Sequence, residues 1–158
     1  MAVSYIATFI DWLTEKIDKN SVQLADNKTR AKWKVIISKP ANVLVSDFFG
    51  KDRKLNAVMT VNRMKGTKGG RRTGQVAKEL HIKYRLDIFS IDTELAKGKD
   101  IRDQLITAIG TAFNANPYTY APLRRNRIDD GPWDDDRIVS GKMLYNSTMV
   151  ILYLVSVV

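Results

Sequence analysis

Apolar and polar side chains alternate along residues 80–90 of the sequence, which read Leu80-His81-Ile82-Lys83-Tyr84-Arg85-Leu86-Asp87-Ile88-Phe89-Ser90. Successive side chains of a β-strand point to opposite faces of a sheet, so this alternation predicts a strand with one apolar face. That face is expected to carry Leu80, Ile82, Tyr84, Leu86 and Ile88. The other face would carry His81, Lys83, Arg85 and Asp87. We therefore expect a sheet built around this strand.

The segments on either side of this strand predict a small mixed fold. Apolar residues at three- and four-residue spacing predict helices over residues 3–19 and 91–116, the second regular from near Lys99. Strands are predicted over residues 32–39, 55–64, 138–145 and 148–157, with a linker over 118–127 and an ambiguous stretch over 41–50. This order predicts the α+β class: one domain, residues 1–158, with a mainly antiparallel sheet packed by an N-terminal helix and one central helix.

The last predicted strand is apolar on both faces. A break near Asn146-Ser147 is expected to separate it from the strand before it. An antiparallel sheet with one wet face would carry polar residues on that face. Both faces of this strand must therefore be covered by helices, by a second sheet or by another subunit. The residues concerned are Met149, Ile151, Tyr153 and Val155 on one face and Val150, Leu152 and Leu154 on the other.

Residues 63–85 hold eight basic residues and one acid, Glu79. Residues 65–74 at the centre of this segment are rich in glycine. Because the segment lies between two predicted strands, we expect a long basic β-hairpin arm over residues 63–79 with a flexible tip. The basic residues are Arg63, Lys65, Lys68, Arg71, Arg72, Lys78, Lys83 and Arg85.

Residues 129–136 form the opposite kind of segment, with five acids and no base: Asp129-Asp130-Gly131-Pro132-Trp133-Asp134-Asp135-Asp136. The Gly131-Pro132 pair is typical of a turn, so we predict a compact acidic loop. Its aspartates are expected to be solvated or paired with arginines. A cationic arm and an anionic loop on one small chain suggest two surfaces that meet a partner.

The composition narrows the possible chemistry. The chain has no cysteine and a single histidine, His81, which excludes thiolate chemistry and sites built from several histidines. The net charge of +9 favours encounter with polyanions. No signal peptide is recognised at the N-terminus, and residues 149–158 are too short to span a bilayer as a helix. These features predict a soluble intracellular protein without membrane contact.

The sequence motifs give little support for an enzyme. The glycines of residues 66–74 lack the spacing of a phosphate-binding loop, and a strand rather than a helix follows them. The five aspartates lack the spacing of a calcium-binding loop, although their oxygens suit hard cations. A metal-dependent nuclease would have to combine Asp87 with Asp134, Asp135 and Asp136, a spacing without a known signature. We therefore expect no catalytic residue, no metal and no cofactor.

The basic arm itself has three interpretations. It is a solvated loop, a sequence-independent nucleic-acid-binding element, or a protein-docking element. No aromatic residue lies between Arg63 and Ile82, so stacking on single-stranded bases has no platform. Docking onto the acidic loop of the next copy, steered by complementary charge, is preferred over nucleic-acid binding. The predicted contact residues are Arg63, Lys65, Lys68, Arg71, Arg72, Lys78, Asp129, Asp130, Trp133, Asp134, Asp135 and Asp136.

The layout of the chain resembles the tail terminator proteins of tailed bacteriophages and related viruses, also labelled minor tail or tail-completion proteins. The resemblance covers most of the chain. It rests on the N-terminal helix, on the pattern Tyr84-Arg85-Leu86-Asp87-Ile88, and on Lys99-Asp100-Ile101-Arg102-Asp103-Gln104-Leu105 at the start of a helix. The resemblance continues through a linker, an Asp/Arg-rich segment and an apolar final strand. The basic arm and the Asp-rich turn have no residue-by-residue match.

The resemblance implies a non-enzymatic structural protein of the virion tail or neck, assembled in the host cytoplasm. Such a protein forms a ring, usually a hexamer, that caps the tail tube and joins it to the head. Its expected partners are further copies of itself, the tail tube protein, a neck or head-completion protein, and the sheath where one exists. DNA would pass through the lumen without being read. The alternative is a nucleic-acid-binding protein that uses the basic arm.

Overall fold

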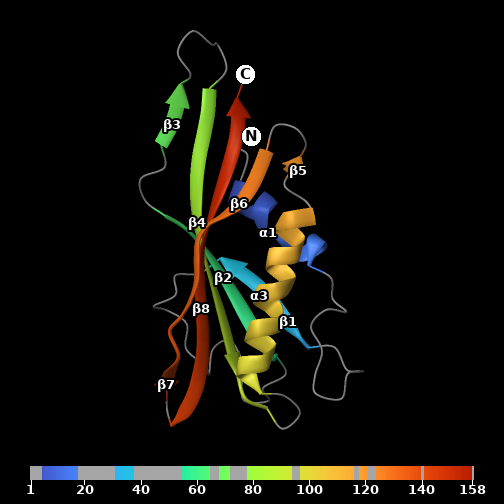
Figure 1. Cartoon of the computed structure of the whole chain (residues 1–158), viewed down its shortest axis with the longest axis vertical. Helices are drawn as coiled ribbons and strands as arrows, with labels where there is room; N and C mark the ends of the chain where they lie inside the picture. The colour runs from blue at the N-terminus through green and yellow to red at the C-terminus, as the bar shows by residue number, and fades with distance from the viewer. Residues whose placement is uncertain are drawn as a thin grey trace.

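The computed structural model describes residues 5–17, 31–37, 55–64, 68–71, 78–93, 97–115, 118–120, 124–139 and 141–157. Two helices and eight strands lie in these residues and form an elongated molecule (Figure 1). In chain order they are α1 (Tyr5–Lys16), β1 (Trp33–Ile37), β2 (Ala57–Arg63), β3 (Lys68–Arg71), β4 (Lys78–Ile91), α3 (Gly98–Ala115), β5 (Tyr118–Tyr120), β6 (Arg124–Asp134), β7 (Arg137–Val139) and β8 (Lys142–Val157).

All eight described strands belong to one sheet. The order is β1-β2-β4-β8-β6-β5, with β3 beside β4 and β7 beside β8. Among these strands, β1 and β2 pair in parallel, and the other pairs are antiparallel. The two longest strands, β4 and β8, pair from Lys78↔Val157 to Ile91↔Leu144 and extend along the long axis (Figure 1). The predicted α+β class with a mainly antiparallel sheet is therefore confirmed.

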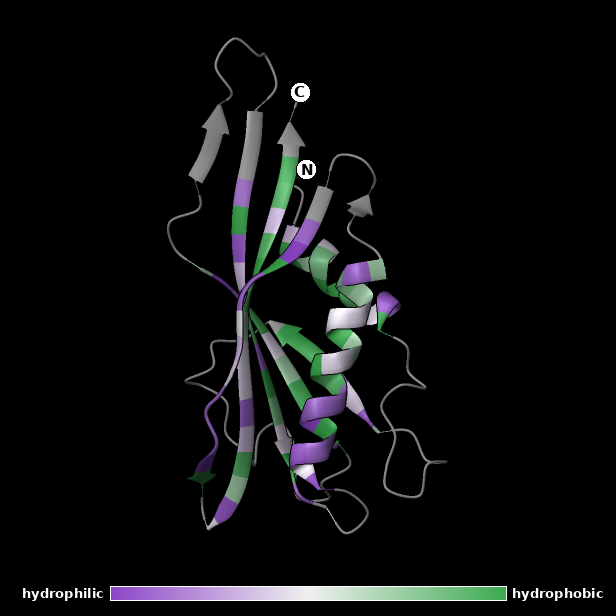
Figure 2. Ribbon diagram, viewed as in Figure 1, coloured by the Kyte–Doolittle hydropathy of each residue, from purple (hydrophilic) through white to green (hydrophobic). Residues whose placement is uncertain are grey.

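The main core lies between the two helices and one face of the sheet. The alternation that predicted β4 is confirmed, because Ile82, Tyr84, Leu86 and Ile88 are all buried in this core. Hydrophobic and hydrophilic residues alternate along β4 (Figure 2). Burial raises the pKa of the Tyr84 phenol, and the nearby Tyr153 raises it further. The core is completed by apolar residues of α1, α3, β2 and β8, among them Phe9, Leu13, Met59, Ile101, Leu105, Ile109, Phe113, Met149, Ile151 and Tyr153.

The opposite face of the sheet carries a smaller apolar cluster. It contains Val58, Phe89, Ile91 and Leu144, all buried. The second face of β8 is buried only in part, because Leu154 is partly exposed. On that face Val150 is only 8% exposed and Leu152 only 5% exposed. Both are buried without a second copy, so the apolar second face of β8 does not by itself require a neighbouring subunit.

The predicted break at Asn146-Ser147 is wrong, because β8 runs without interruption through both residues. Both side chains are buried and have partners in the sheet. The Asn146 amide nitrogen donates to Ile88 O at 3.2 Å, and the Ser147 hydroxyl donates to Trp133 O at 3.4 Å. Asn and Ser are common in turns but fit a strand when their polar groups are satisfied. The turn lies instead at Gly141, which has a φ of 75°.

The predicted linker and the predicted acidic loop are also wrong, because β5 and β6 occupy most of residues 118–134. Without β6, much of the 16-residue strand β8 would be an unpaired edge. The register of β6 against β8 shifts between Ile128 and Asp130 and again between Asp130 and Trp133. Such bulges insert extra residues into a strand, which breaks the alternation that marks a strand in the sequence.

The remaining predictions concern element ends and the arm. The central helix begins at Gly98 rather than residue 91, because β4 continues to Ile91. At Gly98 a Cβ would lie 2.6 Å from Tyr145 Cδ2, so the close packing favours glycine. The base of the predicted hairpin is observed, since β3 pairs with β4 from Lys68↔His81 to Arg71↔Lys78. Residues 41–50, and Lys65 and Arg72 of the arm, lie outside the described residues.

Candidate interaction surface

Two carboxylates of the acidic segment and one of α3 itself surround a buried arginine of α3. The Arg102 side chain is 2% exposed, and its Nη1 donates to Asp136 Oδ1. Its Nη2 lies 3.5 Å from Asp134 Oδ2, and its Nε donates to Asp103 Oδ1 at 3.3 Å. The planar guanidinium suits this arrangement because it presents several N–H donors in a fixed fork. One guanidinium among three carboxylates leaves this group with an excess of negative charge.

The same cluster ties three elements together. Asp136 Oδ1 also accepts from the Asn146 backbone nitrogen of β8 at 3.1 Å. The guanidinium carbon of Arg102 lies 5.8 Å from the centroid of the Tyr145 ring, within the range of a cation–π contact. The Tyr145 hydroxyl lies 3.4 Å from Asp92 Oδ2. Desolvation raises the pKa of this phenol, and the charge of Asp92 raises it further. The acidic segment is therefore fastened to α3 and β8.

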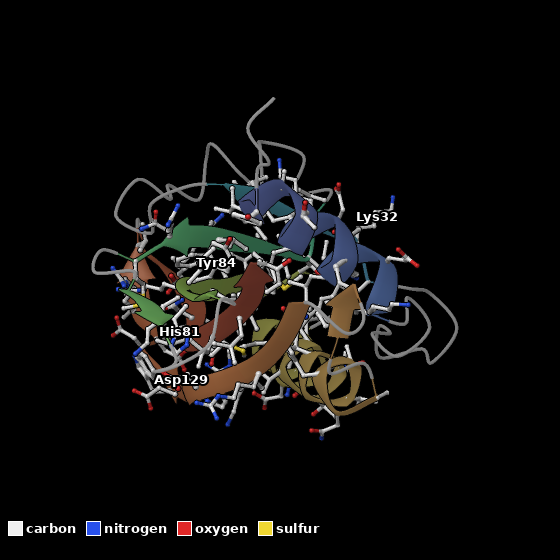
Figure 3. The ribbon with its side chains drawn as sticks, turned by 90° about the horizontal axis from the view of Figure 1, so that it is seen from above. Lys32, His81, Tyr84 and Asp129 are labelled. Atoms are coloured by element: carbon white, nitrogen blue, oxygen red, sulfur yellow. The ribbon has the colours of Figure 1, made fainter. Side chains whose placement is uncertain are left out.

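A second charged group lies on the sheet face opposite the helices. Lys83 Nζ of β4 lies 3.3 Å from Asp129 Oδ2, and Arg127 Nη2 lies 3.7 Å from Asp129 Oδ1. The labelled side chains of His81 and Asp129 lie on the same side of the sheet (Figure 3). All these groups are at least partly exposed, so each pair contributes little to stability. This face combines positive and negative charges that are already paired within the chain.

Asp87, on the same face, has a fully buried carboxylate, at 0% exposure. Its Oδ2 accepts from Arg85 Nε at 3.0 Å, and its Oδ1 accepts from the Thr148 hydroxyl at 2.5 Å. A buried carboxylate requires such partners, because an unpaired charge in the interior is costly. Asp87 therefore joins β4 to β8, and it lies apart from the Arg102 cluster that holds Asp134 and Asp136. The four aspartates of the nuclease hypothesis do not form one group.

Large apolar side chains are exposed where β6, β7 and β8 run together. Trp133 of β6 is 42% exposed, Ile138 of β7 is 71% exposed and Met143 of β8 is 37% exposed. Ile138 and Met143 are cross-strand partners, and Trp133 is the partner of Thr148. Directly paired residues share a face of the sheet, so Ile138 and Met143 form one apolar contact surface. Trp133 pairs with Thr148, which lies five positions beyond Met143 in β8, so its exposed ring is separate from this surface.

The position of Trp133 depends on Gly131, whose φ is 83°. A Cβ at this residue would lie 2.8 Å from the Thr148 carbonyl oxygen and 2.8 Å from Trp133 Cε3. Residues other than glycine rarely adopt this φ, because their Cβ is too close to the backbone there. The backbone oxygen cannot move aside without disturbing the β6–β8 pairing. Gly131 therefore allows both the bulge of β6 and the close approach of the Trp133 ring.

We expect the substitution Gly131→Ala to lower the free energy of unfolding by about 2 kcal/mol, from the unfavourable φ and the close contacts together. Gly141→Ala is the matched control, because Gly141 has a φ of 75° but a Cβ there would meet no atom within 4 Å. That variant should lose only about 1 kcal/mol. Urea denaturation followed by circular dichroism gives both values. Equal losses for the two variants would contradict the packing argument.

The structure separates the predicted contact residues into two regions. The five aspartates lie in or directly after β6, and Asp135 pairs with Arg137 at 2.9 Å. The expectation that these aspartates pair with arginines is confirmed for Asp129, Asp134, Asp135 and Asp136. Arg63 ends β2, and Lys68, Arg71 and Lys78 are placed by the backbone of β3 and β4 alone. Within the described residues, no group of three or more acidic or histidine side chains could hold a metal ion.

Arg102 is the residue that the sequence interpretation missed. It lies three positions before Leu105 and seven before Ile109, so it falls on the buried stripe of α3. An arginine on such a stripe needs a carboxylate partner, and the Asp-rich segment is the obvious source. The prediction of a loop for the acidic segment kept the two features apart. A strand there brings Asp134 and Asp136 to the helix.

No model of a protein family and no curated protein matches this chain. None of the described helices is long and apolar enough to cross a membrane.

Proposed function

We propose that this protein is a non-enzymatic structural component of a virus tail, which forms a ring that caps the tail tube and joins it to the neck or head. The observation that carries the proposal is the apolar surface left exposed by Ile138 and Met143 where β7 and β8 pair, since most large apolar side chains of the described residues are at least partly buried. Ile138 is 71% exposed and Met143, its cross-strand partner, is 37% exposed. Adjacent exposed apolar residues favour contact with another protein.

The resemblance of the sequence to tail terminator proteins supports a contact with other proteins of a virus tail. Its central pattern, Tyr84-Arg85-Leu86-Asp87-Ile88, lies in β4 at the centre of the sheet. Its second pattern, residues 99–105, lies in the first turns of α3 and contains Arg102. Both patterns therefore occupy positions that organise the fold. The proposed partners are further copies of the chain, the tail tube protein and a neck or head-completion protein.

The test is the mass of the protein in solution, measured by light scattering after size exclusion, together with negative-stain electron microscopy. A discrete species near six times the 17.9 kDa chain, seen as rings with a central channel, would support the proposal. A chain that stays monomeric at every concentration and salt, and forms no ring on purified tail tubes, would contradict it.

The net charge of +9 keeps a second function open, namely sequence-independent binding of nucleic acid through the basic arm. Neutralising Lys68, Arg71 and Arg72 distinguishes the two functions. A salt-dependent DNA mobility shift that these substitutions abolish would favour nucleic-acid binding. Loss of ring assembly with unchanged DNA binding would favour the structural role.

A further inference from the structure

The basic hairpin and the exposed Trp133 lie far apart along the same pair of strands. Arg71 of β3 pairs with Lys78 at one end of β4, whereas Trp133 belongs to the row Asp87↔Thr148↔Trp133. Nine residues separate Lys78 from Asp87, and each adds ~3.3 Å along a strand, so the two rows are roughly 30 Å apart. Figure 1 shows β3 and β7 toward opposite ends of the molecule. A chain therefore cannot bring its own β3 to its own Trp133.

The surroundings of Trp133 suit a cationic partner. Asp130 lies three positions before the exposed Trp133 in β6. In the part of the chain that the structure describes, no basic side chain pairs with Asp130. The residue after Trp133, Asp134, points to the opposite face of the sheet, where it contacts Arg102 of α3. An indole ring is the best aromatic partner for an arginine or lysine side chain. The carboxylate of Asp130, on the same face of the sheet, strengthens the attraction for such a cation.

Resting on the proposed ring assembly, we propose that Trp133 and Asp130 form the docking site for the basic β3–β4 end of a second copy of this chain. The cations are those of Lys68, Arg71 and Lys78, which lie at the paired ends of these strands. Charge complementarity selects this occupant, since residues 63–78 hold six basic residues and no acid. The two surfaces differ and lie at opposite ends, so the contact is head-to-tail. Repetition of such a contact closes a ring or extends a filament.

This docking site does not use every aspartate of the acidic segment. Asp134 and Asp136 already hold Arg102, and Asp129 already holds Lys83 and Arg127. These carboxylates already have partners within the chain and stabilise the fold. The side chains left to make the contact are the ring of Trp133 and the carboxylate of Asp130. We therefore expect Trp133 and Asp130 to matter more to assembly than Asp136.

The test compares the self-association of variants by analytical ultracentrifugation at low salt. Trp133→Ala should raise the dissociation constant about tenfold or more, the loss typical of removing an aromatic anchor from an interface. Trp133→Phe should lose less, because a phenyl ring retains a weaker cation–π contact. Asp130→Asn should weaken association, and the effect should shrink at high salt. Asp11→Asn on the exposed face of α1 is a matched control that should associate like the wild-type chain.

A mixing experiment tests the head-to-tail geometry directly. The Trp133→Ala chain retains a basic end, and a Lys68→Glu/Arg71→Glu chain retains an intact patch. At a protein concentration between the dissociation constants of the wild-type and variant chains, each variant alone should remain mostly monomeric, whereas their mixture should form a complex of two chains that grows no further. Circular dichroism and the unfolding midpoint check that all variants are folded.

The outcomes separate this inference from the function on which it rests. A wild-type chain that assembles, with variants that assemble equally well, would overturn the docking site and leave the ring intact. Mixed variants that stay monomeric, although the wild-type chain assembles, would overturn the head-to-tail contact. A wild-type chain that never associates would overturn both this inference and the proposed function.

Discussion

The substitution Phe9→Ala is expected to lower the free energy of unfolding by about 3–5 kcal/mol, the range for truncating a buried phenylalanine. Phe9 of α1 is 0% exposed and lies between the helices and the sheet. Its ring centroid is 5.0 Å from that of Tyr84 on β4 and 6.4 Å from that of Phe113 on α3. Stacked aromatic pairs contribute beyond the area that they bury. Removal of this ring would leave a cavity where α1, α3 and the sheet meet.

Denaturant unfolding followed by circular dichroism and by tryptophan fluorescence measures this loss. Phe9→Leu should lose less, because most of the volume is retained. Thr14→Ala on the same helix is the matched control, since Thr14 is exposed and its hydroxyl donates to Ile10 O at 2.8 Å within the helix. That change should be neutral or slightly stabilising, because alanine has the higher helix propensity. A loss below about 1 kcal/mol for Phe9→Ala would mean that α1 does not pack on the sheet as described.

The elements with a regular period could be predicted from the sequence. The alternation around Tyr84 assigned the correct faces to β4, and the stripe of Ile101, Leu105 and Ile109 identified the buried side of α3. Apolar residues recur at every second position in β4 and at every third to fourth position in α3, so the pattern is direct evidence of the face that packs in the core. The chain order of these elements was then enough for the α+β class.

The elements that were predicted wrongly from the sequence depend on contacts between residues far apart in the chain. β6 carries mostly charged residues, and its bulges near Asp130 break the period of two. β6 forms a strand because β8 needs a partner along its edge. Residues 124–134 alone do not show this requirement. The continuity of β8 through Asn146 likewise depends on an acceptor 58 positions away, Ile88 O. Local propensity cannot anticipate such partners.

The candidate site was predicted in its residues but not in its organisation. The sequence identified Trp133 and the aspartates as an unusual cluster, and the structure places them in or directly after one strand. Which carboxylates are already engaged depends on Arg102, which comes from a helix 32 to 34 positions earlier in the chain. Since Asp129, Asp134, Asp135 and Asp136 all have cationic partners in the structure, Asp130 and Trp133 are the described residues of this segment that remain to bind a cation. Only the three-dimensional arrangement distinguishes these two roles.

The substitution Arg102→Met is expected to lower the free energy of unfolding by about 3 kcal/mol, because removing one partner of a buried ion pair leaves charges without compensation. The side chains of Asp134 and Asp136 are 55% and 34% exposed, so water can recover part of the loss, which places it at the low end of the usual range. Arg102→Lys should fall between the wild-type chain and Arg102→Met, because one ammonium group cannot contact three carboxylates in the geometry of a planar guanidinium.

A double-mutant cycle with Asp136→Asn tests whether this loss comes from the ion pair. The two substitutions should be strongly non-additive, because each removes the same contact. Arg85→Met is a matched control: its charge pairs with Asp87 rather than with Asp136, so its effect should add to that of Asp136→Asn. Additive losses for Arg102 and Asp136 would show that the methylene stem of Arg102, and not its charge, carries the stability.

Hydrogen exchange connects this cluster with the docking surface. The Asn146 backbone nitrogen donates to Asp136 Oδ1, and the Asp135 nitrogen donates to Asn146 O at 3.0 Å. Loss of Arg102 should therefore accelerate exchange at both amides, while the amides of β2 and β4 remain protected. The end of β6 would then be held to β8 without its attachment to α3, and Trp133 would lose a fixed position. Self-association should weaken in Arg102→Met although Trp133 and Asp130 are unchanged, which would make Arg102 a positioning residue for the interface.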